Sequence, residues 1–372
     1  MRVGLGVVKA IEPGAAATGI GVYTSSLWRE LSRAPGLSVV PIKGFGGHAS
    51  GTDKSTAFPW NYGLSAAVSM MTGLPFRGAR LLEDKIDVYH ATDYWIPRLR
   101  RIPVVATLHD AIALSHPEWA TPARRRAKNV LLKSGARWAD AIITVSAAMV
   151  PEIIEHFGVS EDRVHVVHNG VSSDWFVRVT PKQSSATMKR YGIEPGYILT
   201  IGTLQPRKNL GRLLAAHAML PEDLRRSHPL LVVGSRGWAA EAEMVMLSSA
   251  VARGQTTWLQ HVPTGELSTI FQNARALALP SLYEGFGLPL VEAFASGIPV
   301  MTANTSALRE VADDAALLSD PLDVREMADA LRRIVDDPAL RTHLIARGNK
   351  RAADFSWEHC ASQTIEIYRK LL

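Results

Sequence analysis

The stretch "PSLYEGFGLPLVEAFASGIPV", residues 280–300, carries two acids, Glu284 and Glu292, in an otherwise apolar run that glycine and proline interrupt. Its three prolines and two carboxylates exclude a membrane helix, because they leave backbone groups and charges unsatisfied in hydrocarbon. The run therefore belongs to a protein interior or to a binding cleft. Buried carboxylates are rare unless something pairs with them, so we expect each glutamate to meet a protein group or a ligand group.

Outward from this run, short apolar segments alternate with amphipathic ones along the chain, beginning with "VGLGVV" (3–8) and "VYTSSLWRELSR" (22–33). This alternation predicts βαβ units around parallel sheets. It breaks at the polar segment "TPKQSSATMKR" (180–190) and restarts at "YILTIG" (197–202). A chain of 372 residues also exceeds the size at which single cores usually stop growing. We therefore predict an α/β fold with two doubly wound, Rossmann-like parallel-sheet domains, residues 1–178 and 187–355, joined by a linker at 179–186.

The composition is that of an ordinary globular protein, with 47% hydrophobic and 20% charged residues. The net charge of +6 favours an anionic partner, and nucleic acid, anionic lipid and phosphorylated small molecules all fit that charge. The single cysteine, Cys360, excludes an internal disulfide and fits a reducing compartment. Because no uninterrupted apolar stretch reaches membrane-spanning length, we expect a cytoplasmic or peripheral protein.

Ligands of open α/β sheets sit beyond the carboxyl ends of the strands, so loops that follow predicted strands are the places to look. The loop "GAAATGIGVYTSSL" (14–27) ends in Gly19 and Gly21 just before a predicted helix. Glycines there let the backbone approach an anion at the positive helix end, and a merely flexible loop is the alternative. Gly4 and Gly6 do not complete a dinucleotide fingerprint, because Lys9 stands where a third glycine is needed.

The loop "GTLQPRKNLGRLL" (202–214) places Arg207 and Lys208 immediately before a predicted helix. Two cations at a helix N-terminus oppose the macrodipole, and a bound diphosphate reverses that cost. A pair of solvated basic side chains is the alternative. The pattern of a phosphate-binding P-loop is absent, which argues against nucleoside triphosphate hydrolysis.

His109 and Asp110 end a predicted strand in "VVATLHDAIAL" (104–114). An imidazole at the carboxyl end of a strand points toward the cleft, where it can donate to a sugar hydroxyl or a phosphate; a structural histidine is the alternative. The sequence has no cysteine and histidine cluster with zinc spacing, so we predict no metal site.

Basic residues gather in a central region, within which Trp119 and Trp138 flank a predicted helix. Such a surface suits an anionic membrane leaflet, and a solvated helix face is the alternative. The segment "TAFPWNYGLSAAVSMMTGLPF" (56–76) is a second candidate for an acceptor-side or membrane-facing element, with ordinary packing as its alternative. The basic residues are Arg98, Arg100, Arg101, Arg124, Arg125, Arg126, Lys128, Lys133 and Arg137.

The run from Glu284 to Glu292, followed by "GIPV" (297–300), resembles the E-x7-E signature of retaining GT-B glycosyltransferases of the family 4-like group. That group includes sucrose synthase and bacterial mannosyltransferases of surface-polysaccharide synthesis. Other segments fit the family in the same order along nearly the whole chain. They are "TGIGVYT", "ATLHDAIALSHPEW", "ITVS", "RVHVVHNGV", "IGTLQPRKNL", "VVGSRGW", "ARALALPSLYEGFGLP", "NTSALREVADDAALLSDP" and "FSWEHCASQTIEIY".

The resemblance implies a nucleoside diphosphate sugar as donor, bound mostly by the second domain, with the acceptor mostly on the first. It implies that Glu292 accepts hydrogen bonds from the ribose diol, for which two carboxylate oxygens are well suited. It places Glu284 beside the transferred sugar, whose hydroxyls the backbone N–H groups of Phe286, Gly287 and Leu288 hold.

The same resemblance assigns Arg207 and Lys208 to the leaving diphosphate, where they do the work of a metal ion. It implies that the glycine loop closes over the diphosphate, that His109 contacts the sugar near the reacting carbon, and that Val262 lies by the base. Thr203 departs from the arginine that many members carry at that position. The resemblance also implies that the C-terminal helix, residues 356–372, crosses back to the first domain.

The first hypothesis is a cytoplasmic, retaining hexosyltransferase that acts on a glycan or lipid-linked acceptor. The segments "GTLQPRKNL" and "NTSALREV" resemble those of bacterial mannosyltransferases, which favours GDP-mannose as donor over a UDP-sugar. A nucleotide-sugar epimerase, a phosphorylase and a non-catalytic sugar-nucleotide-binding protein on the same fold are the alternatives. We expect no cofactor and no nucleic acid partner.

Overall fold

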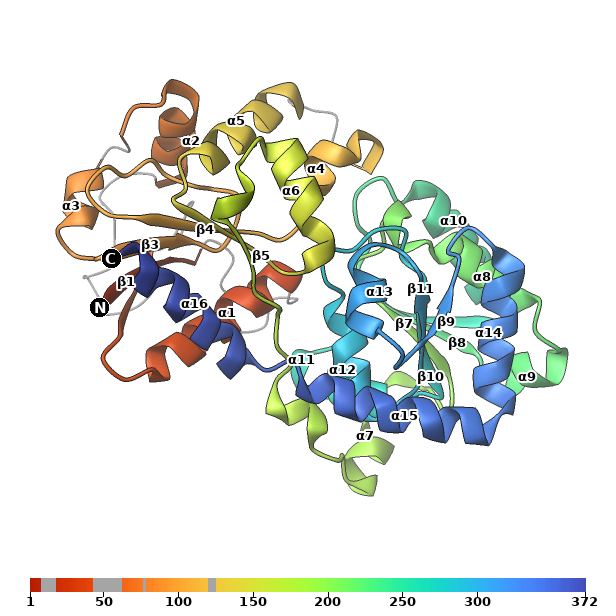
Figure 1. Cartoon of the computed structure of the whole chain (residues 1–372). Coiled ribbons are helices and arrows are strands. Elements are labelled where there is room, and N and C mark those ends of the chain that lie inside the picture. Colours follow the sequence, from red (N-terminus) through yellow and green to blue (C-terminus); the bar gives the residue numbers. More distant parts are fainter. Residues whose placement is uncertain (8–17, 43–61, 76–77, 120–124) are drawn as a thin grey trace. The chain divides into compact units, whose positions relative to one another are not determined.

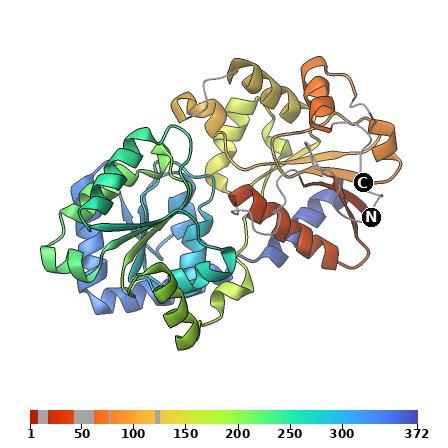
Figure 2. The same cartoon turned by 180° about the vertical axis from the view of Figure 1, so that it is seen from behind.

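The computed structural model describes residues 1–7, 18–42, 62–75, 78–119 and 125–372. These residues form two compact units. The first contains Met1–Gly170 together with Trp357–Leu372, and the second contains Val171–Ser356 (Figures 1 and 2). Each unit has its own parallel sheet with helices around it, which confirms the predicted fold class.

The first unit is built on a six-stranded parallel sheet in the order β2-β1-β3-β4-β5-β6. Figure 1 shows α1 and α16 on one face of this sheet, and α2, α5 and α6 on the other. The strands are β1 (Arg2–Gly6), β2 (Ser38–Ile42), β3 (Val88–Ala91), β4 (Val104–Leu108), β5 (Ala141–Thr144) and β6 (Val164–Val166). The helices are α1 (Gly19–Arg33), α2 (Tyr62–Thr72), α3 (Ala79–Glu83), α4 (Ile112–Ser115), α5 (Arg125–Arg137), α6 (Val150–Phe157) and α16 (Trp357–Leu371).

The second unit is built on a six-stranded parallel sheet in the order β12-β11-β10-β7-β8-β9. The strands are β7 (Ile198–Ile201), β8 (Leu230–Val233), β9 (Thr256–Leu259), β10 (Ala276–Leu279), β11 (Val300–Ala303) and β12 (Leu317–Ser319). The helices are α7 (Pro181–Tyr191), α8 (Leu210–Ala218), α9 (Glu222–Ser227), α10 (Glu241–Ala252), α11 (Thr264–Gln272), α12 (Leu288–Ser296), α13 (Ser306–Ala312), α14 (Val324–Asp336) and α15 (Pro338–Ala353). Strands β8 and β10 are buried throughout, as expected for a parallel sheet covered on both faces.

Each sheet has one place where the strand order reverses, and these places determine where a ligand can bind. In the first unit the chain starts at β1, adds β2 on one side and continues with β3 on the other. In the second unit it starts at β7, adds β8 and β9 on one side and continues with β10 on the other. Ligands of doubly wound sheets bind beyond the carboxyl ends of the strands at such switch points. The residues that follow β7 and β10, and those that follow β1 and β3, are therefore the first to examine.

The segment predicted to be a linker, residues 179–186, lies largely in α7 instead. Thr180 and Gln183 form a reciprocal capping box, and Pro181 stands in the first helical turn. These are helix-start signals, so the polar composition that suggested a linker belongs to the exposed side of a helix. The chain passes between the units at Gly170 and Val171 rather than at 178, and returns after Ser356.

The C-terminal helix α16 belongs to the first unit, although it is last in sequence. It packs against α1, and its Tyr368 hydroxyl lies 2.6 Å from His90 Nδ1 on β3. Within the second unit, the two segments that lead out of it run side by side, because the Val171 N–H donates to the Phe355 carbonyl (3.1 Å).

A close approach of two backbones fixes the loop after β7. Gly202 N–H donates to the Val233 carbonyl (2.9 Å), and Gly234 has a φ of +147°. A Cβ atom on Gly234 would lie 2.0 Å from the Gly202 carbonyl oxygen, so only glycine fits. The loop that begins at Gly202 leads to Arg207 and Lys208.

We expect Gly234→Ala to lower the free energy of unfolding by about 1–3 kcal/mol, because alanine is strained at this φ and clashes with Gly202. Gly265→Ala is the matched control, since a Cβ there meets nothing within 4 Å; its effect should stay within about 0.5 kcal/mol. Urea unfolding measures both variants. Equal stability of the Gly234 variant and the wild type would refute the close approach.

Candidate active site

The switch point of the second unit brings together the two segments that the sequence singled out. Arg207 and Lys208 follow β7 in a short 3-10 turn, and Glu284 follows the neighbouring strand β10. The loops also contact each other directly, because the Leu282 N–H donates to the Arg207 carbonyl (2.8 Å). The two motifs, far apart in sequence, therefore form one site.

Asn209 joins the two loops of this site, a role that was not predicted from the sequence. It has a left-handed φ of 60°, is 4% exposed and stands directly before α8. Its side-chain amide donates to the carbonyls of Pro280 (3.0 Å) and Pro321 (2.6 Å), and so ties the β7 loop to the end of β10. An asparagine before a predicted helix is a signal for a left-handed position, but its partners are set by tertiary structure.

The Glu284 carboxylate is held by both cations. Lys208 Nζ lies 2.5 Å from one oxygen, and Arg207 Nη1 lies 2.9 Å from the other. Arg207 Nη1 also donates to the Tyr283 carbonyl (3.0 Å). The three side chains are only 21% (Arg207), 15% (Lys208) and 10% (Glu284) exposed, so the pair of bonds is poorly screened by water.

The electrostatics of this cluster favour the charged carboxylate. Burial alone raises the pKa of Glu284, but the charges of Arg207 and Lys208 outweigh burial and lower that pKa to about 2. Burial and the neighbouring Arg207 lower the pKa of Lys208, and Glu284 offsets only part of that shift. Two cations share one carboxylate, so the cluster has an excess positive charge that a second anion can neutralise.

The turn after Glu284 leads into α12 and supports both acids. Gly287 stands before the helix with a φ of 97°, and a Cβ there would lie 2.6 Å from Leu308 Cδ2. Ser306 Oγ accepts from the Glu284 N–H (3.3 Å) and donates to the Glu284 carbonyl (3.1 Å). The N–H groups of Leu288 and its neighbours form the positive end of α12, which suits oxygen ligands.

Glu292, in the second turn of α12, contrasts with Glu284. It is half-buried, and among the described residues no side chain or backbone group donates a hydrogen bond to its carboxylate. Burial raises its pKa to about 7. Of the two acids in the run 280–300, Glu284 has a protein partner, whereas Glu292 is available to a ligand that can donate hydrogen bonds.

Two further predicted residues follow strands of the same sheet. Thr203 is exposed directly after Gly202, and Val262 is buried in the loop after β9. Because β7, β8 and β9 are parallel neighbours, both residues belong to the carboxyl edge of the sheet, with β8 between them.

The predicted residues of the first unit lie around its own switch point. His109 follows β4 and is 8% exposed. Its Nε2 lies 3.0 Å from the Thr92 carbonyl, which can only accept, so in the neutral ring Nε2 carries the proton. The sequence led us to expect a donor toward substrate, but this donor is already engaged.

Gly19 and Gly21 form the first turn of α1, where Gly19 is exposed and Gly21 buried. Thr18 caps this helix, because its Oγ1 accepts from the Gly21 N–H (3.2 Å). The first turn of α1 thus offers the N–H of Gly19, while that of Gly21 has an internal partner. Residues 14–17 of the predicted glycine loop lie outside the described residues.

The basic region is only partly described. Residues 120–124 lie outside the described residues, and Arg100, Arg101, Lys133 and Arg137 are exposed. Arg98 instead donates to the Gly73 carbonyl and packs over Trp138, with 5.6 Å from its guanidinium carbon to the ring centroid. Of the candidate segment 56–76, residues 56–61, which include Trp60, and residue 76 lie outside the described residues, and several side chains at the start of α2 are also not described. Met71 on α2 is 71% exposed.

No helix in the described ranges is both long and apolar enough to cross a bilayer. Within the same ranges, no three His, Cys, Asp or Glu side chains are grouped as a metal site requires.

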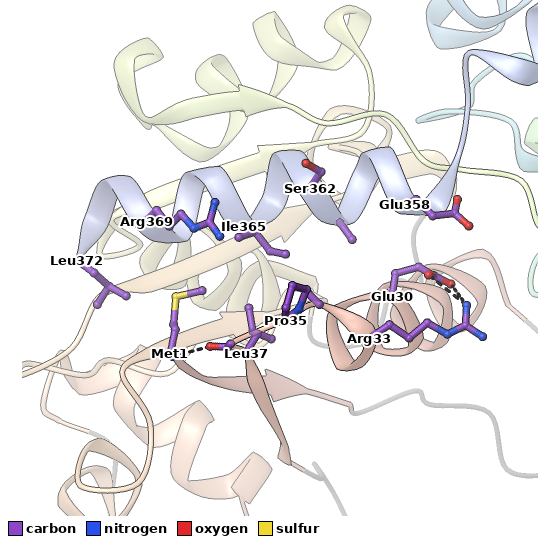
Figure 3. Close-up of a pocket in the computed structure, with 13 residues that line it drawn as sticks. Met1, Glu30, Arg33, Pro35, Leu37, Glu358, Ser362, Ile365, Arg369 and Leu372 are labelled. Carbon is purple, nitrogen blue, oxygen red and sulfur yellow. Dashed lines mark hydrogen bonds and ion pairs between the residues drawn. The ribbon is translucent and has the colours of Figure 1, made fainter.

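A pocket of about 540 Å³ lies elsewhere in the first unit, between the C-terminal half of α1 and α16 (Figure 3). Met1 and Leu37 line it, and they directly precede β1 and β2, so the pocket is at the amino edge of the sheet. Its Glu30 is already paired with Arg29 and Arg33. This pocket is therefore separate from the carboxyl edge where the candidate residues lie.

Comparisons with known proteins identify the family of the chain. Residues 17–175 match the model of Glycosyltransferase Family 4, and residues 185–351 match that of Glycosyl transferases group 1. The chain is 34% identical to O-antigen chain mannosyltransferase B of Escherichia coli, over 95% of this chain and 96% of that protein.

Solved structures share the fold. Sucrose-phosphate synthase from Thermosynechococcus elongatus superposes with a TM-score of 0.77 at 22% identity, covering 100% of this chain and 98% of that one. Anabaena Alr3699/HepE, solved in complex with UDP, gives a TM-score of 0.71 at 16% identity, covering 100% of both chains. The resemblance seen in the E-x7-E run is thereby confirmed. The chain belongs to the family 4 and group 1 glycosyltransferases, and is a hexosyltransferase of the GT-B fold.

Proposed function

We propose that this hexosyltransferase transfers mannose from GDP-mannose to a glycan or lipid-linked acceptor, with retention of the anomeric configuration. The observation that carries the proposal is the convergence of Arg207 and Lys208 on one buried carboxylate at the switch point of the second unit. The mannosyl donor is supported by the O-antigen chain mannosyltransferase that shares 34% identity over nearly the full length of both chains. The UDP bound to Alr3699/HepE makes a UDP-sugar the competing donor.

When the donor binds, its diphosphate takes over part of the ion pairing that Glu284 makes with Arg207 and Lys208. In the structure Arg207 and Lys208 share the single negative charge of Glu284. A diphosphate brings a larger charge and more acceptor oxygens, so it draws both cations toward the leaving group, where negative charge develops in the transition state. Lys208 and Arg207 then act without rearranging the backbone that holds them.

The proposed transfer needs only the donor and the acceptor as reactants. The bond between the sugar C1 and the β-phosphate oxygen breaks, and the acceptor oxygen bonds to C1 on the same face. The proton of the acceptor hydroxyl passes to the leaving diphosphate, which thus serves as base. The role of the protein is to hold the leaving charge and to orient the sugar.

The remaining residues bind the donor. As Glu284 gives up part of its hold on the cations, its carboxylate can accept from sugar hydroxyls, together with the N–H groups of Phe286, Gly287 and Leu288. Glu292 accepts from the ribose diol, which fits a half-buried carboxylate without a donor among the described residues. Val262 and Thr203 belong to the same sheet edge and serve the base and the diphosphate.

In the first unit, the proposal assigns His109 to the sugar and the first turn of α1 to the diphosphate. Exposed arginines at 100, 101 and 137 support peripheral contact with an anionic membrane on the cytoplasmic side, where a lipid-linked acceptor would be found. The epimerase, phosphorylase and non-catalytic readings are not favoured, since the matched relatives are named as transferases.

Lys208→Ala should lower kcat by about 100-fold to 1,000-fold, because a donor to the developing charge is lost in a site with little water. Lys182→Ala is the matched control, an exposed lysine on α7 of the same unit, and should retain wild-type turnover. Sugar transfer from GDP-mannose is assayed for both. Near-normal turnover of the Lys208 variant would remove Lys208 from the mechanism.

Glu292→Gln should stabilise the free protein at high pH while weakening donor binding. The folded-state pKa of Glu292 is raised to about 7 from 4.5, so the wild type loses stability as pH rises between these values and Gln does not. At pH 8, relative to pH 5, we expect the variant to gain about 1–3 kcal/mol over the wild type. Its affinity for GDP should fall by about 1–3 kcal/mol.

Urea unfolding at both pH values and calorimetric titration with GDP test this pair of effects. Glu194→Gln, an exposed acid of the same unit, is the control and should change neither quantity. Unchanged GDP affinity of the Glu292 variant would refute the ribose contact, even if the pH-dependent gain in stability were found.

A further inference from the structure

Four buried polar side chains form a hydrogen-bonded chain across the first unit. The Tyr368 hydroxyl on α16 lies 2.6 Å from His90 Nδ1 on β3, and His90 Nε2 lies 2.8 Å from Thr107 Oγ1 on β4. Thr107 Oγ1 lies 2.8 Å from the Tyr23 hydroxyl on α1. All four residues are 0% exposed. The chain therefore links the two helices on one face of the sheet through the two strands beneath them.

The hydrogens of these groups can be assigned consistently in either direction along the chain. Burial, together with the charge of His109, lowers the pKa of His90 to about 3, so its ring is neutral and has one donor and one acceptor nitrogen. Burial keeps both tyrosines protonated by raising their pKa values. Each of the three links then has one hydrogen. The fourth hydrogen, on the hydroxyl of Tyr23 or of Tyr368 according to the direction, lies outside the three links. A buried network of this kind holds its members in place.

The hydrogen-bonded chain ends at Tyr23, beside the candidate catalytic residue His109. The Tyr23 ring stands perpendicular to the His109 ring, with an interplanar angle of 85° and 4.8 Å between centroids. The next residue of α1, Thr24, donates to Thr92 Oγ1 (3.0 Å), and Thr92 Oγ1 donates to the Gly6 carbonyl. Thr92 is the residue whose carbonyl accepts from His109 Nε2. Adjacent residues of α1 thus fix both the ring face and the Nε2 partner of His109.

We propose that Tyr23 and Thr92 are positioning residues for His109, and that Tyr368 of α16, acting through His90 and Thr107, holds Tyr23 in place. Thr92 selects the Nε2–H tautomer, so Nδ1 is the acceptor nitrogen of the neutral His109 ring. The inference rests on the proposed function, in which His109 contacts the transferred sugar. It gives the C-terminal helix a part in transfer that its place in the sequence does not suggest.

The choice of residues argues against a purely structural role. Val or Phe at these positions would fill a core without the desolvation cost of four polar groups, so the network is not needed for burial alone. The separation of 278 residues between His90 and Tyr368 also means that the last helix must be docked before the network is complete. Orientation of His109 and docking of α16 are therefore coupled.

The test uses the full chain and a matched pair at Thr107. Thr107→Val keeps the shape and removes the hydroxyl, whereas Thr107→Ser keeps the hydroxyl. Tyr368→Phe breaks the chain at its far end and serves if Thr107→Val does not fold. Arg369→Ala is the control on α16, because its exposed side chain lines the amino-edge pocket rather than the network (Figure 3).

The first readout is independent of activity. Long-range proton–nitrogen NMR of histidine-labelled protein reports the tautomer of His109, with its signals identified by their loss in His109→Gln. We expect the Nε2–H tautomer in the wild type, in Thr107→Ser and in Arg369→Ala. In Thr107→Val and Tyr368→Phe we expect shifted and broadened His109 signals.

The second readout is transfer from GDP-mannose. We expect kcat to fall about tenfold in Thr107→Val and Tyr368→Phe, since small misplacements of a reacting group slow turnover. KM for the donor should stay within about twofold, because the donor is bound mostly by the second unit. Thr107→Ser should restore kcat. Wild-type kcat and unshifted His109 signals in the folded Thr107 and Tyr368 variants would overturn the positioning role.

The two claims fail in different ways. If His109→Gln transfers sugar as fast as the wild type, the role of His109 in the proposed function is wrong, whatever the NMR signals show. If His109→Gln is slow but the Nδ1–H tautomer is found in the wild type, the proposed function stands and the inference about Thr92 is overturned.

Discussion

The arrangement of the second unit depends on one interaction, the sharing of the Glu284 carboxylate between Arg207 and Lys208. Two cations beside a helix N-terminus repel each other and the helix dipole, and burial makes both effects stronger. Glu284 balances that repulsion only in part, because two positive charges share its single negative charge. The loop after β7 that carries both cations is held by the hydrogen bonds of Asn209 and by the close approach of Gly202 and Gly234.

The two acids of the E-x7-E run have opposite electrostatic roles because of what surrounds them. Glu284 is charged at all ordinary pH values, since its cations lower its pKa to about 2. No cation of the described residues pairs with Glu292, and burial raises its pKa to about 7. One helix start places both on the edge of the sheet where the strand order reverses. A donor with a diphosphate at one end and a ribose diol at the other matches this pair of environments.

Much of the fold follows from the sequence, because a buried parallel sheet produces apolar runs that alternate with amphipathic helices. The position of Arg207, Lys208 and Glu284 after strands could also be predicted, whereas the ion pairs between them are seen only in the structure. Three other features were not predicted. The polar composition of residues 179–186 led to a linker prediction where α7 begins, although the capping box of Thr180 and Gln183 indicates a helix start. The hydrogen bonds of Asn209 and the engaged Nε2 of His109 depend on carbonyls brought close only by folding.

The most direct test of this account is a calorimetric titration of the wild type and of the Arg207→Ala/Lys208→Ala double variant with GDP and with UDP, in EDTA and in magnesium. The account predicts micromolar binding of one nucleoside diphosphate to the wild type without metal, weakened by about 100-fold or more in the double variant. Equal affinity of the two proteins, or binding that requires magnesium, would contradict the assignment of the two cations to the diphosphate.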